Sequence, residues 1–134
     1  MFSPVARILI LDPSDTARQH LAGQLADIGF RQVTAVADDT AAWELMEKGA
    51  GGKQAFHVVL CDWETAYGEK GFLARLRGNA QLKTLAVLVI LPKGATTAPA
   101  HPTNLTVQAF LQNPTRLADL VRSLKHTDSE RTAA

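Results

Sequence analysis

Two aspartates, Asp12 and Asp62, carry the residue type and spacing most suited to chemistry in this sequence of 134 residues. Each directly follows a short apolar run, Ile8–Leu11 and Val58–Cys61 respectively. Two carboxylates in one cleft repel each other, so such a pair favours a bound cation such as Mg²⁺ or a shared proton. With a cation present, one carboxylate could act as a nucleophile toward a phosphoryl group. The alternative is that both aspartates only cap the turns that follow them.

Alternating apolar runs and helical periodicities predict the elements that position this pair. Strands are expected over 6–11, 32–37, 56–61, 85–91 and 107–111, and helices over 15–28, 39–49, 72–77 and 115–124. Five apolar strands that alternate with helices predict an α/β fold with a parallel sheet covered on both faces. Ligands bind such sheets at the carboxyl ends of the strands, which directs attention to Asp12, Asp62, Leu91 and Asn113.

The segment 93–104 breaks the alternation. Pro99 and Pro102 and the lack of apolar periodicity argue against a full helix, so a loop or one irregular turn is expected there. The chain is expected to form one domain over 1–125, followed by a polar tail over 126–134.

Composition excludes several classes of function. Fourteen Lys and Arg against thirteen Asp and Glu give a net charge of +1, which argues against binding of nucleic acid driven by bulk charge. A single cysteine, Cys61, excludes an internal disulfide and fits a reducing, cytoplasmic setting. The longest apolar run, Leu85–Leu91, is far shorter than the roughly 20 residues of a membrane span, so membrane insertion is not expected.

Several segments resemble the receiver domain of two-component response regulators. The similar segments are Ile8–Asp12, Gly29–Phe30, Val58–Trp63, Leu76–Leu85 and Asn113–Thr115, so the resemblance covers about residues 6–125. The similarity is greatest to the single-domain chemotaxis type, since no length remains for an output domain. It implies a flavodoxin-like, doubly wound sheet with strand order 2-1-3-4-5. The family's fourth helix would fall in the proline-containing segment 93–104, so it is expected to be shortened or replaced by a loop.

The resemblance also implies roles for individual residues. Asp62 would be the phosphoacceptor, receiving phosphate from a histidine kinase or a phosphotransfer protein. Asp12, Asp62 and the backbone carbonyl of Glu64 would hold Mg²⁺, with Asp15 or the Glu64 side chain as possible substitutes for a missing acid. The chain would then be a signalling module rather than an enzyme, a monomer or a weak dimer.

Three residues depart from the family pattern, and one of them alters the surroundings of a fourth position, Phe110. Pro13 replaces the second of two adjacent acids and has neither a carboxylate nor an N–H group. Leu91 replaces a Thr or Ser whose hydroxyl would contact the phosphoryl group, and Asn113 replaces a lysine that would pair with it. Phe110 matches the family's switching aromatic residue, but Leu91 offers it no hydroxyl.

Two hypotheses of function follow from these residues. The first is a stand-alone receiver-like protein that acts in phosphorelay signalling through protein contacts, with weak or absent phosphorylation at Asp62. The alternative is a functional, Mg²⁺-dependent phosphoacceptor switch at Asp62. A flavodoxin-like cofactor binder is disfavoured, because the segment Pro13–Thr16 offers no glycine-rich or Ser/Thr-rich cradle for a phosphate.

Overall fold

The computed structural model describes residues 6–49, 55–68, 71–79, 82, 85–95 and 107–124. Its elements are β1 (Arg7–Leu11), α1 (Asp15–Ile28), β2 (Gln32–Val36), α2 (Asp39–Gly49), β3 (Val58–Asp62), α3 (Trp63–Tyr67), α4 (Phe72–Arg77), β4 (Ala86–Ile90) and β5 (Ala109–Leu111). A C-terminal helix follows over 117–124.

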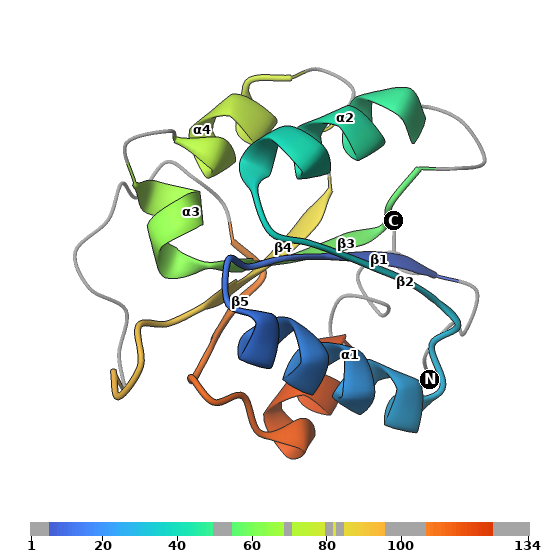
Figure 1. The fold of residues 1–134 in the computed structure, drawn as a ribbon, viewed down its shortest axis with the longest axis vertical. Helices are drawn as coiled ribbons and strands as arrows, with labels where there is room; N and C mark the ends of the chain where they lie inside the picture. Colours follow the sequence, from blue (N-terminus) through green and yellow to red (C-terminus); the bar gives the residue numbers. More distant parts are fainter. Residues whose placement is uncertain are drawn as a thin grey trace.

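The strands form one parallel, five-stranded sheet in the order β2-β1-β3-β4-β5. Helices α2, α3 and α4 cover one face, and α1 and the C-terminal helix cover the other (Figure 1). This doubly wound arrangement and its strand order confirm the fold predicted from the sequence.

The core is divided into two layers by the sheet. Alternate residues of β1 serve opposite faces: Leu9 and Leu11 pack toward α2 and α4, whereas Ile8 and Ile10 pack toward α1 and the C-terminal helix. All four are fully buried. A parallel strand covered on both faces has no solvent side, which is why these runs are continuously apolar rather than alternating.

Local capping agrees with the sequence at both of the first two helices. The Ser14 hydroxyl accepts the N–H of Ala17 at 3.2 Å, and the Asp38 carboxylate accepts the N–H of Ala41 at 2.8 Å. Helix α1 ends at Gly29, as expected. These contacts fix where the chain leaves β1 and β2.

The structure differs from the sequence prediction in a few places. Helix α3 was not expected, and it begins directly after Asp62. Strand β5 starts at Ala109 rather than at 107. The sequence also favours Thr115 as the N-cap of the last helix, but that helix starts at 117, and the Thr115 hydroxyl donates backward to the Gln112 carbonyl at 2.9 Å.

Two predictions fall partly or wholly outside the described residues. Residues 93–95, directly after β4, form a turn. The rest of the segment 93–104, which is expected to replace the helix that the family has between β4 and β5, lies outside the described residues, as does the tail. Among the described residues, no helix combines the length and apolar character needed to cross a membrane.

Candidate functional site

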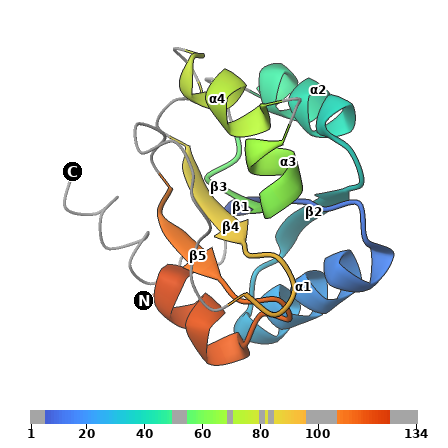
Figure 2. The ribbon, with the colours of Figure 1, turned by 90° about the vertical axis from the view of Figure 1, so that its left-hand side faces the viewer.

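The register of the sheet brings the two aspartates to one edge. Leu11 of β1 pairs with Cys61 of β3, so Asp12 and Asp62 are the next residues on neighbouring strands. Asp62 in turn pairs with Ile90 of β4, and Ile90 pairs with Leu111 of β5. The carboxyl ends of all these strands therefore meet at one side of the molecule, which faces the viewer in Figure 2.

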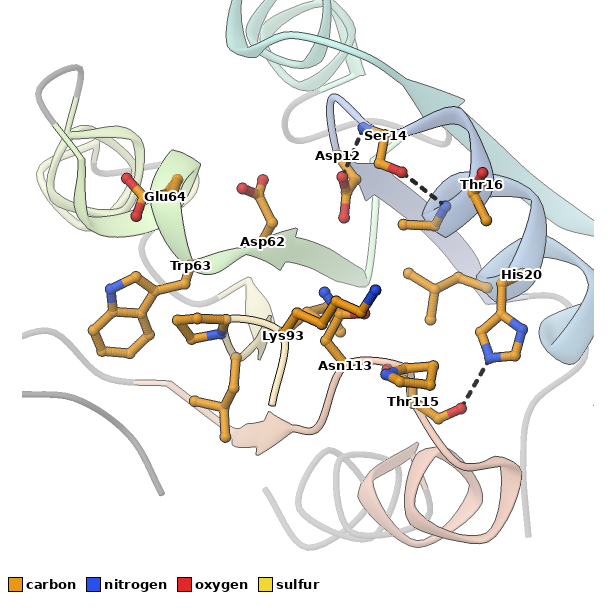
Figure 3. A pocket seen from close by; sticks show the side chains of 16 residues that line it. Asp12, Ser14, Thr16, His20, Asp62, Trp63, Glu64, Lys93, Asn113 and Thr115 are labelled. Carbon is orange, nitrogen blue, oxygen red and sulfur yellow. Dashed lines mark hydrogen bonds between the residues drawn. The ribbon is translucent and has the colours of Figure 1, made fainter. Parts of the chain in front are cut away.

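A pocket of about 730 Å³ opens at this edge. Figure 3 shows the carboxylates of Asp12 and Asp62 on one side of it and Lys93 and Asn113 on the other. The lining comprises Asp12, Ser14, Thr16, Ala17, His20, Leu21, Asp62, Trp63, Glu64, Ile90, Leu91, Pro92, Lys93, Asn113, Pro114 and Thr115. The pocket thus contains both predicted acids and two of the three departing residues, Leu91 and Asn113.

Asp12 is buried, with 6% of its surface exposed. Its Oδ1 accepts the backbone N–H of Ser14 at 2.8 Å, and its main-chain carbonyl accepts the Arg18 guanidinium at 2.6 Å. Burial raises the pKa of Asp12 above its ordinary value, and the neighbouring charge of Asp62 raises the pKa further, against the opposing effects of the Ser14 N–H and Arg18. The two acids therefore repel each other within this site.

The two carboxylate oxygens of Asp62 have different surroundings. One carboxylate oxygen, Oδ2, accepts the backbone N–H of Thr65 at 3.3 Å and so caps α3. The other oxygen, Oδ1, is buried and has no hydrogen-bond partner among the described residues. A buried carboxylate oxygen without a partner is unfavourable, and a hard cation beside it would remove that cost.

The two remaining acids near the site lie less favourably for a metal. The carbonyl oxygen of Glu64 points along α3 at Gly68, so closely that a Cβ on Gly68 would collide with it. It is thus directed away from the Asp62 end of the helix. Asp15 forms an ion pair with Arg18 on the exposed side of α1. Among the described residues, no group of three or more His, Cys, Asp or Glu side chains could hold a metal ion.

The departing positions surround the acids. Leu91 is buried, at 4% exposure, directly after β4, and its N–H donates to the Leu111 carbonyl at 2.7 Å. Asn113 is half-buried in the pocket wall, and Pro13 is exposed beside Asp12. Leu91 supplies no hydroxyl and Asn113 no charge, so neither offers the contact that the resemblance assigns to its position.

Comparison with known proteins agrees with the fold. No protein-family model matches the chain. Chemotaxis protein CheY-3 of Vibrio cholerae is 28% identical over 120 residues, 88% of each chain. A Rhizobium etli protein named "Probable chemotaxis protein CheY" is 28% identical over 89 residues, 66% of this chain and 65% of its own length. The solved structure of chemotaxis response regulator CheY4 of Vibrio cholerae superposes with a TM-score of 0.74 at 21% identity, over 92% of this chain and 98% of that one.

The chain resembles the response-regulator receiver domains in sequence and in fold. The family resemblance predicted from the sequence is confirmed.

An aromatic cluster sits beside the site of this receiver-like domain. The Trp63 ring lies 4.4 Å from that of Tyr67 and 6.1 Å from that of Phe110, measured between ring centroids. Trp63 directly follows Asp62, so these tilted ring contacts join the acidic site to β5. Phe110 is half-buried and packs against the core layer that contains Leu9 and Leu11.

Lys93 is the residue of the pocket that sequence reasoning missed. The sequence suggests an ordinary solvated lysine, but the structure places it in the pocket lining, two residues beyond Leu91. The signal was present in the run Pro92-Lys93-Gly94, which is typical of a turn immediately after a strand. His20 also borders the pocket, where its Nε2 lies 2.9 Å from the Thr115 carbonyl.

Proposed function

We propose that this receiver-like domain acts in two-component signalling through protein contacts, with weak or absent phosphorylation at Asp62. The observation that carries the proposal is the buried Leu91 side chain beside the acids, where the family pattern has a hydroxyl. A hydrogen bond to a charged group contributes about 1.5–3 kcal/mol, and a neutral one about 0.5–1.5 kcal/mol. With Leu91 and Asn113 in place, little of that energy distinguishes a phosphorylated from an unphosphorylated state.

The residues present fit a Mg²⁺ ion held mainly by two carboxylates and by water. Asp12 and Asp62 would hold it, and the unpartnered Oδ1 of Asp62 supports this assignment. Ligation by the Glu64 carbonyl would require α3 to unwind at its start, because that oxygen points toward Gly68. When bound, the ion would neutralise the mutual repulsion of the acids and the charge of an incoming phosphoryl group.

A second candidate is the Mg²⁺-dependent phosphoacceptor switch. It is favoured by the mutual repulsion of the acid pair, since the Asp62 charge raises the pKa of Asp12. A site built only for packing would gain nothing from two adjacent acids, one buried and one half-buried. In this candidate, the tilted ring contact between Trp63 and Phe110 would carry a change at Asp62 to β5.

The proposed partners are a histidine kinase, a phosphotransfer protein or another signalling protein, and the proposed setting is the cytoplasm. The domain would act there as a monomer or a weak dimer, without turnover of its own. The similarity to proteins named as chemotaxis regulators supports this choice of partner class.

The test uses beryllium fluoride, a phosphoryl mimic, and tryptophan fluorescence. A Trp43→Phe background leaves Trp63, which lines the pocket, as the reporter. If the domain signals through protein contacts with weak or absent phosphorylation, Trp63 fluorescence should change little or not at all when Mg²⁺ and beryllium fluoride are added at millimolar concentration. A large, saturable change that Asp62→Asn abolishes would overturn this proposal in favour of the switch.

A further inference from the structure

Lys93 is held at the pocket by a defined turn. The N–H of Ala95 donates to the Pro92 carbonyl at 2.9 Å, which closes a four-residue turn with Lys93 at its second position. Gly94 has φ +85° at the third position, a conformation that other residues adopt only with strain. The turn follows directly on Leu91, whose N–H is bonded to β5. Lys93 is therefore positioned by the end of the sheet.

Acidic side chains outnumber lysine and arginine in the described lining of the pocket. Asp12, Asp62 and Glu64 line the pocket together with Lys93, which is the only lysine or arginine among the described lining residues. The nearby Arg18 is already used, because it bonds the Asp12 carbonyl and pairs with Asp15. Figure 3 shows the Lys93 side chain across the pocket from Asp62.

We propose that Lys93 supplies the positive charge for a phosphoryl group on Asp62, in place of the lysine that the family pattern has where this chain has Asn113. The cation would enter from the end of β4 rather than from the end of β5. Asn113 would add a neutral hydrogen bond from its amide, since it lines the same pocket. This inference rests on the second candidate function, the phosphoacceptor switch.

The register of β4 and β5 explains how a residue beyond one strand can take the role of a residue beyond the other. Ile90 of β4 and Leu111 of β5 are register partners, so residues just beyond the two strands face the same pocket. A lysine side chain is long and flexible and acts as a point charge, so its contact with an anion depends less on the direction of approach than that of arginine does. Because Lys93 is exposed, its replacement should change the free energy of unfolding of the protein only slightly.

The experiment measures the apparent dissociation constant of beryllium fluoride in the presence of Mg²⁺, by Trp63 fluorescence in the Trp43→Phe background. Lys93→Ala is expected to weaken binding about tenfold, the loss of one charge-assisted contact. Lys48→Ala is the matched control, because Lys48 is an exposed lysine on α2 that does not line the pocket. It should leave the constant unchanged within about twofold.

A second variant tests the exchange of positions. Adding Asn113→Lys to Lys93→Ala should restore most of the lost affinity, because the charge returns to the pocket from β5. Equal binding by Lys93→Ala and the parent, with a signal that still requires Asp62, would overturn the role of Lys93 and leave the switch standing. A parent protein without any Asp62-dependent signal would overturn both the switch and this inference.

Discussion

The carboxylate of Asp62 accepts the backbone N–H of Thr65 at 3.3 Å, so the proposed phosphoacceptor is also the N-cap of α3. Its second oxygen is buried without a partner among the described residues, and its charge acts on Asp12. One side chain therefore both starts a helix and is the proposed site of phosphorylation. Modification of Asp62 would compete with the cap, because both use the same carboxylate.

The capping role predicts different effects for two substitutions of Asp62. Asp62→Ala removes the acceptor for the Thr65 N–H and is expected to lower the free energy of unfolding by about 1 kcal/mol. Asp62→Asn keeps an acceptor oxygen and removes the repulsion with Asp12, so it should equal or exceed the parent in stability. Urea unfolding of the three proteins measures this, and equal losses for both variants would contradict the capping role.

The raised pKa of Asp12 predicts that Asp12→Asn stabilises the metal-free protein at neutral pH. The folded protein holds the Asp12 proton more tightly than the unfolded chain, so the ionised carboxylate disfavours folding above the folded-state pKa. The gain from the substitution should therefore be full at pH 7. It should shrink as the pH falls through the raised pKa and vanish below the ordinary value of 3.8.

Urea unfolding of Asp12→Asn and the parent across this pH range measures the effect. The amide oxygen introduced by this substitution would still accept the Ser14 N–H, so the turn after β1 is preserved. Asp27→Asn on the exposed side of α1 is the control and should show no such pH dependence. If the difference in the free energy of unfolding between Asp12→Asn and the parent is the same at all pH values, the stabilisation does not arise from the charge of Asp12.

The loss of the hydroxyl at Leu91 predicts that Leu91→Thr strengthens binding of beryllium fluoride. One added neutral hydrogen bond of about 0.5–1.5 kcal/mol corresponds to an affinity gain of about two- to tenfold. Leu91→Val is the matched control, because valine has the shape of threonine without the hydroxyl. Both variants should lose similar stability, since Leu91 is buried, and equal affinities for the two would refute the hydroxyl contact.

Burial predicts that Cys61 is chemically inert in the folded protein. Its side chain is fully buried, and burial raises the pKa of its thiol well above the ordinary value, with the Asp62 and Asp12 charges adding to the rise. At pH 8 a thiol reagent should label the native protein about a thousandfold more slowly than the urea-unfolded chain. Rapid labelling of the native protein would show that β3 opens at the site.

The apolar pattern of the chain was enough to predict the sheet and the place of the acids. Continuous apolar runs that end in Asp12 and Asp62 predict buried parallel strands, and parallel strands bring their carboxyl ends to one edge. Caps at Ser14 and Asp38 were also predictable, because an N-cap depends on residues only a few positions apart. Here local pattern and topology suffice.

The surroundings of the acids, in contrast, follow from tertiary packing. The start of α3 at Trp63, the direction of the Glu64 carbonyl and the pairing of Asp15 with Arg18 depend on how the loops pack beyond the strands. Lys93 enters the pocket because the turn at Gly94 and the bond from Leu91 to β5 direct the chain there. Side-chain direction past a strand end is set by such contacts between distant segments, which no local periodicity encodes.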